Sequence, residues 1–354
     1  VKIDFYGDAN VLFEAFKAGR ISAVREFNAE TWATQYDFPA ISRGEVVKSS
    51  FPHSKPSGMT GFVMNSRRAP FDDWRVRDAL ISAFNFEYIN ETLTGGALPR
   101  ITSYFSNSDL AMRDGPATGR VFDLLADYAD TLPPGTVDGY RLPVADGSVR
   151  NRSGIRAAMQ QLNAAGYQAE GGVMRRADGT PLTFSILLSK GSRENLAIAE
   201  LYTQALKRLG ITAQIETVDD AQFVARQNEY DFDMTFFRRA LSLSPGTEQR
   251  FYWGSEAADL PGTRNLMGVR SPAVDAMINQ MLQARETADF VAATRALDRI
   301  LTAGRYVIPF WQFDEGLIAH DARMAYPDTI PLYGDGPNFM PEVWWWKPAE
   351  NSDQ

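Results

Sequence analysis

The chain has 354 residues, which is enough for about two domains of ordinary size. A hydrophobic fraction of 44% supplies a large core and excludes wholesale disorder, and the apolar runs are much shorter than a membrane span. The formal net charge of −8 argues against nucleic acid as a partner, and the absence of cysteine excludes disulfides and thiolate metal sites.

The amino-terminal region predicts a strand, a helix and a long connection. Apolar and polar residues alternate over 1–6, as they do in a strand. Asp8 can cap a helix over 9–18 that ends at Gly19. Residues 40–60 are rich in Ser, Gly, Pro and Lys, which predicts a connection between two lobes. The first residue opens directly into the predicted strand, so we expect any secretion signal to have been removed or to lie outside this chain.

A short apolar strand is predicted at 61–65 and a helix at 73–85. Residues 105–153 contain many Gly, Pro and Asp turn signals. We therefore expect this segment to be a long wrapping excursion and not a separate domain.

The middle of the chain alternates strands and helices. Ser153 is placed to cap a helix that ends at Gly166, and Asp178-Gly179 marks a hairpin turn. Because strands and helices alternate along the chain, we expect parallel strands joined by right-handed crossovers in an α/β lobe. The strands are predicted at 182–188, 212–218 and 231–237, and the helices between them at 192–209 and 220–227. Helices over 271–282, with Pro272 in the first turn, and 287–304 precede a last strand at 306–311.

Enzyme signatures are missing from the sequence. It contains no P-loop, no Gly-x-Ser-x-Gly elbow, no Ser-x-x-Lys pair and no dinucleotide glycine motif, so we predict no catalytic residue and no cofactor. Three pairs of acids could be catalytic in principle. The first two pairs are better explained as helix caps and the third as a solvated sheet edge. The pairs are Asp72/Asp73, Asp219/Asp220 and Asp231/Asp233.

Only two histidines occur, His53 and His320, and neither has metal-ligand spacing with another donor. We interpret both as surface or packing residues and predict no metal site.

Polar side chains follow the third predicted strand of the α/β unit. Ligands of open α/β sheets bind outside the carboxyl ends of the strands. Arg238 and Arg239, with the hydroxyls of Ser242 and Ser244, could hold a carboxylate or another anion there. The alternative, a solvated arginine pair in a surface loop, remains open.

Several segments together resemble a known family. Gly61-Phe-Val-Met-Asn65, Ala69-Pro-Phe-Asp-Asp73 and Val76-Arg-Asp-Ala-Leu80 resemble the signature of family 5 extracellular solute-binding proteins, the peptide- and nickel-binding components of bacterial ABC importers. Further motifs resemble the YejA-like branch, associated with oligopeptides and microcin C-type peptide-nucleotides. They are Ser103–Ala111, Ser242–Gly246, Glu248-Gln-Arg250, Tyr252-Trp-Gly254, Ala292–Leu301 and Ile308-Pro309.

The resemblance implies an α/β fold of the periplasmic-binding-protein type II clamshell kind. Family members are longer at the amino terminus, so it also implies that this chain is the carboxyl-terminal portion of such a protein. On that basis residues 1–58 and 319–354 are parts of domain I, and residues 59–318 are the nearly complete second lobe, domain III.

The function implied is that of a periplasmic substrate-binding component that closes two lobes around an oligopeptide or a peptide-like compound. The implied partners are the ligand and the permease subunits of the ABC transporter, with the receptor a monomer and no nucleic acid bound. Two other classes stay open: a periplasmic sensor with no transport role, and a carboxylate-dependent hydrolase that no nucleophile motif supports.

Relatives carry an aromatic residue and then an acidic anchor for the peptide amine in the loop after the third strand. The matching positions here are Arg239 and Ser242, which lack that chemistry, and Glu248 is the substitute we consider. The arginine pair favours instead an anionic group or a carboxyl terminus of the ligand. Tyr104 and Arg100, in the branch-specific loop, are two further ligand candidates.

Overall fold

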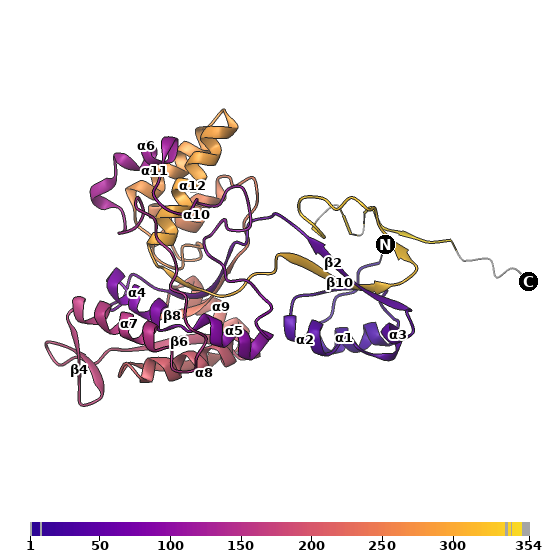
Figure 1. Cartoon of the computed structure of the whole chain (residues 1–354), viewed down its shortest axis with the longest axis horizontal. Helices are drawn as coiled ribbons and strands as arrows, with labels where there is room; N and C mark the ends of the chain where they lie inside the picture. The colour runs from indigo at the N-terminus through magenta and orange to yellow at the C-terminus, as the bar shows by residue number, and fades with distance from the viewer. Residues whose placement is uncertain (1, 8, 337–338, 341, 349–354) are drawn as a thin grey trace, which may run out of the picture. The chain divides into compact units, whose positions relative to one another are not determined.

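A computed structural model describes residues 2–7, 9–336, 339–340 and 342–348. The chain divides into two compact units (Figure 1). Unit 1 comprises residues 1–55, 93–99 and 313–354, and unit 2 comprises residues 56–92 and 100–312.

Unit 1 is built on a three-stranded antiparallel sheet in the order β1-β10-β2. Successive residues of the central strand β10 point to opposite faces, so Ile318 joins a cluster with Phe51, and Ala319 joins another with Phe16. The elements are α1 (Ala9–Lys17), β1 (Ala23–Glu26), α2 (Ala29–Thr34), α3 (Pro39–Ser42), β2 (Val46–Pro52), β10 (Glu315–Asp321), β11 (Met324–Ala325) and β12 (Trp345–Trp346).

The strand expected at residues 1–6 is wrong for the described residues 2–6, which have no regular structure. Their hydrophobic side chains are exposed, with Ile3 67% and Phe5 92% accessible. Alternation alone does not make a strand, because a strand also needs a hydrogen-bonding neighbour, and β10 already pairs with β1 and β2 on its two sides. The helix that follows is confirmed at α1, and Gly19 ends it with a φ of 70°. The predicted cap, Asp8, lies outside the described residues.

Unit 2 contains a five-stranded sheet in the order β7-β6-β8-β3-β9. β6 runs parallel to both β7 and β8, as the strand–helix alternation predicts, whereas β3 is antiparallel to β8 and β9. The strands are β3 (Met59–Met64), β4 (Tyr167–Glu170), β5 (Val173–Arg176), β6 (Thr183–Ser189), β7 (Thr212–Val218), β8 (Met234–Arg239) and β9 (Val307–Pro309).

The helices of unit 2 include a pair, α11 and α12, that pack together, with α6 against α12 (Figure 1). They are α4 (Trp74–Ala83), α5 (Phe86–Thr94, whose last two residues fall in unit 1), α6 (Gly119–Ala126), α7 (Arg152–Ala164), α8 (Arg193–Lys207), α9 (Asp220–Asn228), α10 (Glu248–Trp253), α11 (Pro272–Gln283) and α12 (Thr287–Ala303), with short 3-10 turns at Ala129–Thr131 and Ser255–Ala257.

Acidic residues cap two of these helices, as predicted. The Asp73 carboxylate accepts a hydrogen bond from Arg75 N at 2.9 Å, and the Asp219 carboxylate accepts one from Gln222 N at 2.9 Å. Pro272 lies in the first turn of α11, where its missing N–H costs nothing. These acids are therefore used in helix formation.

Other boundaries differ from the predictions. Asn151, and not Ser153, caps α7, by accepting from Gly154 N at 3.2 Å. β8 begins three residues late because the Asn65 amide takes the carbonyls of Tyr230 and Phe232, each at 3.0 Å, away from the ladder. The excursion at 105–153 contains the unpredicted helix α6, and the hairpin β4–β5 was also not predicted.

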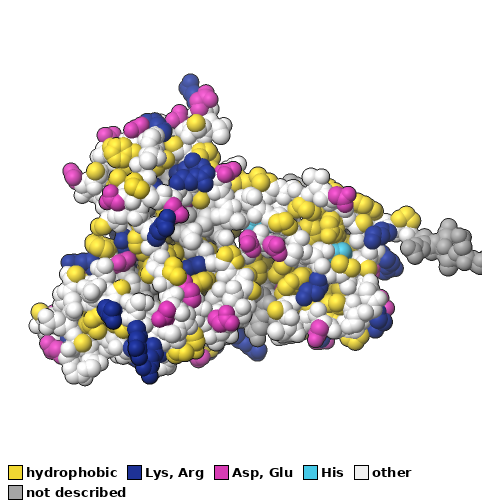
Figure 2. All heavy atoms as spheres, in the orientation of Figure 1, with side chains coloured by type: hydrophobic (Ala, Val, Ile, Leu, Met, Phe, Trp, Pro, Cys, Tyr) yellow, Lys and Arg dark blue, Asp and Glu magenta, His cyan; other side chains and the backbone are white. Residues whose placement is uncertain are grey.

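The surface carries charges of both signs. Figure 2 shows acidic and basic side chains interspersed with hydrophobic ones on the face it draws. Within the described residues, no helix has both the length and the apolar character needed to span a bilayer.

Candidate functional site

The loop that follows β8 lies at the carboxyl end of the parallel strands β6 and β8. The register pairs Arg239, the last residue of β8, with Met59, the first residue of the antiparallel strand β3. The chain then passes through residues 240–247 before α10 begins at Glu248. We call residues 238–248 the β8 loop, and it carries five of the seven predicted site residues.

Arg239 is the most constrained of them. Its guanidinium lies 4.4 Å from the ring centroid of Tyr252 in α10 and 5.7 Å from that of Phe237. Burial lowers the pKa of Arg239, which remains a cation at neutral pH. Its Nε is buried without a hydrogen-bond partner among the described residues. Stacking thus fixes a positive charge with one unused donor at this end of the sheet.

Gly58 explains how the loop is held against β3. Its φ is +66°, and a Cβ at this position would lie 2.1 Å from the carbonyl oxygen of Arg239. Only glycine accommodates both the left-handed conformation and the close approach of the two backbones. This contact was not predicted from the sequence, although a glycine just before an apolar strand was a usable signal.

The remaining loop residues are arranged by local hydrogen bonds. Arg238 is exposed, and Ser244 N donates to Ser242 Oγ at 3.2 Å. Glu248 Oε1 accepts from Gly246 N at 2.8 Å and from Gln249 Nε2 at 3.1 Å. Burial acts to raise the pKa of Glu248, but these hydrogen bonds outweigh it and leave the pKa lowered. The Glu248 carboxylate is therefore already hydrogen-bonded within its own loop.

Tyr104 lies in the core beneath α10. Its ring meets Trp253 edge-on at 5.1 Å, and Trp253 Nε1 donates to Gln249 Oε1 at 2.6 Å. The Tyr104 hydroxyl contacts Met267 Sδ at 3.7 Å, and burial raises its pKa well above the usual value. With 1% of its surface accessible, Tyr104 supports α10 from below and presents no surface to a ligand in this structure.

Arg100 lies apart from the β8 loop. It forms a bridge with Trp311, stacks 5.0 Å from the Phe86 ring centroid, and donates from Nη1 to Pro143 O at 2.8 Å. Burial lowers its pKa to about 10, and its Nε and Nη2 lack partners among the described residues. These contacts hold Arg100 beside Trp311, two residues after the end of β9.

The histidines are packed inside unit 1. His320 Nε2 lies 2.9 Å from Ser49 Oγ, and its Nδ1 lies 2.9 Å from Asp321 O. His53 is 9% accessible, and its backbone N donates to Asp314 O at 3.2 Å. Among the described residues, no three histidines or acids lie close enough together to hold a metal ion.

Comparison with known proteins identifies the family to which the chain belongs. Residues 1–259 match the family described as bacterial extracellular solute-binding proteins, family 5 Middle. The chain therefore belongs to the family 5 extracellular solute-binding proteins, as its sequence motifs predict.

The relatives include two proteins of Agrobacterium fabrum. One, named "Probable peptide-binding protein YejA", is 40% identical over 351 residues, which cover 98% of this chain and 56% of that protein. The other, named "Peptidoglycan-binding protein YepA", is 37% identical over 353 residues, with coverage of 98% and 56%. The chain thus spans a little over half the length of these relatives.

A solved structure shows the same fold. The oligopeptide-binding protein AppA of Bacillus subtilis, in complex with a nonapeptide, matches with a TM-score of 0.71 at 16% identity, covering 96% of this chain and 59% of AppA. This match confirms the predicted α/β fold of the periplasmic-binding-protein type.

Proposed function

We propose that the protein is the substrate-binding component of a bacterial ABC importer, and that it binds oligopeptides or peptide-like compounds in the periplasm and delivers them to permease subunits. The observation that carries this proposal is membership of family 5 together with 40% identity to a relative named as peptide-binding. Such a receptor works without catalysis and as a monomer.

We assign unit 1 to the first lobe and unit 2 to the second lobe of the receptor. Unit 1 exposes large hydrophobic side chains, with Phe5 92%, Phe27 61%, Leu332 59% and Trp346 51% accessible. Large apolar side chains that are this exposed are stabilised when they pack against further polypeptide. The relatives, of which this chain spans 56%, have the length to supply it.

The β8 loop supplies the contribution of unit 2 to the ligand site. Arg239 offers a guanidinium that is fixed by stacking on Tyr252, and Arg238 beside it is exposed to solvent. Two guanidiniums favour a carboxylate, as at the carboxyl terminus of a peptide or on an acidic side chain. The hydroxyls of Ser242 and Ser244 add hydrogen-bonding groups along the same loop.

Glu248 is a weaker anchor for a peptide amine. Its Oε1 already accepts two hydrogen bonds from the loop itself, so a ligand amine would have to share that oxygen or use the other one. The site therefore selects the anionic end of a ligand more strongly than the cationic end. We place Tyr104 and Arg100 in supporting roles, since both are held by intramolecular contacts.

A second candidate ligand class follows from the relative named as peptidoglycan-binding, at 37% identity. Peptide fragments of peptidoglycan carry several carboxylates, which an arginine pair would suit. The two classes share one site and differ in the ligand recovered from it.

The test is a binding measurement on the full-length protein with the double variant Arg238→Ala/Arg239→Ala. We expect at least about a tenfold loss of affinity for a carboxylate-bearing peptide, with the fold intact by circular dichroism. The control, Arg120→Ala/Arg285→Ala, removes the same charge from another part of unit 2 and should bind normally. Unchanged affinity in the first variant would remove the arginine pair from the site.

A further inference from the structure

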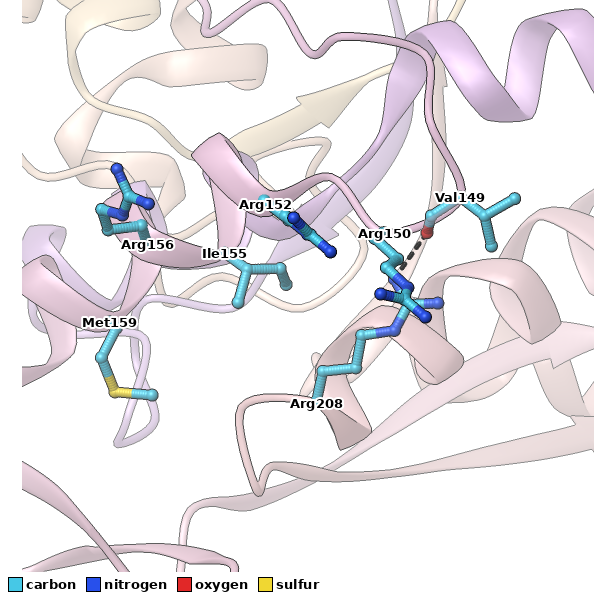
Figure 3. A pocket seen from close by; sticks show the side chains of 7 residues that line it. All are labelled: Val149, Arg150, Arg152, Ile155, Arg156, Met159 and Arg208. Atoms are coloured by element: carbon cyan, nitrogen blue, oxygen red, sulfur yellow. Dashed lines mark hydrogen bonds between the residues drawn. The ribbon is translucent and has the colours of Figure 1, made fainter.

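A pocket of about 680 Å³ lies in unit 2, between the amino-terminal part of α7 and the end of α8 (Figure 3). Four arginines line it and no acidic residue does. Arg152 and Arg156 belong to α7, Arg150 to the turn before it, and Arg208 follows α8 directly. Figure 3 draws Arg150, Arg152 and Arg208 near one end of the pocket, with Arg156 and Met159 further along α7.

These arginines keep their charge available. None of the four forms an ion pair with a carboxylate among the described residues, and all four are exposed. Arg208 Nη1 donates to Val149 O at 2.5 Å, which fixes its position. Asp146 interacts electrostatically with Arg152, but accepts its hydrogen bonds from Ser148. Four positive charges in one pocket stand out in a chain whose net charge is −8.

The other wall of the pocket is apolar. Ile155 and Met159 are four residues apart on α7 and so share one face of the helix, and Val149 is 54% exposed in the preceding turn. A cationic end and an apolar wall in one pocket fit a ligand that is itself amphipathic.

The pocket is separate from the β8 loop. α8 starts after the carboxyl end of β6 and finishes just before the amino end of β7, which is parallel to β6. Arg208 therefore lies at the amino ends of the parallel strands, whereas the β8 loop lies at their carboxyl ends. A ligand in this pocket would not compete directly with a peptide at the β8 loop.

We propose that this pocket is a second binding site, for an organic phosphate whose phosphate group is held by Arg150, Arg152 and Arg208 and whose apolar part lies against Ile155 and Met159. The three guanidiniums come from three backbone segments, the turn before α7, α7 itself and the end of α8. A tetrahedral phosphate offers three terminal oxygens to donors from different directions, whereas a planar carboxylate is satisfied by one guanidinium fork. The amino end of α7 adds partial positive charge on the same side.

The test is calorimetric titration of the full-length protein with 1-naphthyl phosphate and with inorganic phosphate at low ionic strength. We expect 1-naphthyl phosphate to bind at least about tenfold more tightly than inorganic phosphate, because only it uses the apolar wall. Arg152→Gln/Arg208→Gln should weaken its binding at least about tenfold. Met159→Ser should weaken 1-naphthyl phosphate but leave inorganic phosphate unchanged.

The matched control is Arg120→Gln/Arg285→Gln, which removes two arginines from a cavity that also contains Glu286 and Asp289. It should leave 1-naphthyl phosphate binding within about twofold of the wild type, because phosphate is repelled where acids are present. If neither phosphate probe binds, or if the two double variants weaken binding equally, the proposal is overturned. The peptide affinity of the β8 loop is measured separately and does not depend on this result.

A second arm distinguishes the sources of the phosphate. Vesicles of phosphatidic acid, whose headgroup is a phosphate monoester with three terminal oxygens, test a lipid headgroup in a co-sedimentation assay. Phosphatidylcholine vesicles are the reference. Vesicle binding that is lost in Arg152→Gln/Arg208→Gln identifies a lipid headgroup as the source. Binding of 1-naphthyl phosphate without vesicle binding identifies a soluble organic phosphate.

Discussion

Asp298 of α12 accepts a hydrogen bond from the hydroxyl of Ser103 at 2.7 Å, although 195 residues separate them in the sequence. The same buried carboxylate accepts from the backbone N of Tyr104 at 2.8 Å, of Phe105 at 3.3 Å and of Met112 at 2.8 Å. One side chain thus ties the segment 103–112 to α12, and with it Tyr104, which supports Trp253 and α10.

Asp298→Ala should strongly destabilise unit 2. The substitution leaves the three backbone N–H groups without their acceptor in the core, so we expect the free energy of unfolding to fall by about 3 kcal/mol. Urea denaturation followed by tryptophan fluorescence measures the change. Asp109→Ala is the control, because the Asp109 side chain on the same segment is 97% accessible. Equal stability of the Asp298→Ala variant and wild type would contradict this role.

An element can be predicted from the sequence when the residues that decide it lie close together along the chain. Asp73 as a cap, Pro272 in a first turn and the parallel unit from 182 to 237 were predictable, because neighbouring residues decide them. The start of β8 was not, because the amide of Asn65, far away in the chain, takes the carbonyls that would have extended it.

The candidate site was predictable to a similar extent. Arg238 and Arg239 could be selected from the local sequence pattern, because it predicts the parallel strand at whose end they lie. The stacking of Arg239 on Tyr252 and the approach of Gly58 depend on tertiary contacts that leave no periodicity in the sequence. Asp298 gave no signal, since an acid in a helix that also carries Asp289, Arg295 and Arg299 resembles a surface residue until its partners are known.

His53 should make unit 1 sensitive to acid. Burial is the largest cause that lowers the pKa of His53 to about 4, and the nearby positive charge of Lys55 is the second. Because the folded pKa lies below the unfolded value of about 6.5, the associated stability is present above pH 6.5 and is lost as the pH falls towards 4. We expect His53→Gln to remove about 1–2 kcal/mol of this pH dependence, because solvent screening reduces the full effect of the shift. Thermal unfolding of both proteins between pH 7 and pH 4 measures it, and parallel pH profiles would refute the assignment.

Gly58→Ala should displace the β8 loop. A Cβ at this position would lie 2.1 Å from Arg239 O, so β3 and the end of β8 must move apart. We expect a loss of about 2–4 kcal/mol of stability and weaker peptide binding. Gly95→Ala is the matched control, because Gly95 has the same φ of +66° with no atom within 4 Å of the added Cβ. If both variants lose equal stability, the close approach to Arg239 contributes nothing.

Tyr252→Leu should reduce ligand affinity through Arg239. The substitution removes the ring that lies 4.4 Å from the guanidinium while keeping an apolar side chain in α10. We expect a several-fold loss of affinity for a carboxylate-bearing peptide. Tyr252→Phe should lose less, because it keeps the ring and removes only the hydroxyl that interacts with the guanidinium. Calorimetric titration of both variants with the peptide measures these affinities. Equal affinities of the leucine and phenylalanine variants would show that stacking does not position Arg239.

The most direct test of the proposed function is native mass spectrometry of the full-length protein purified from a bacterial host, repeated after denaturation. We predict bound peptides or peptide-like compounds that are released with unchanged mass, and whose masses give the length of the ligand. Recovery of cleaved products would contradict a receptor and indicate an enzyme. An empty protein that shows no thermal shift with a peptide library would contradict peptide binding.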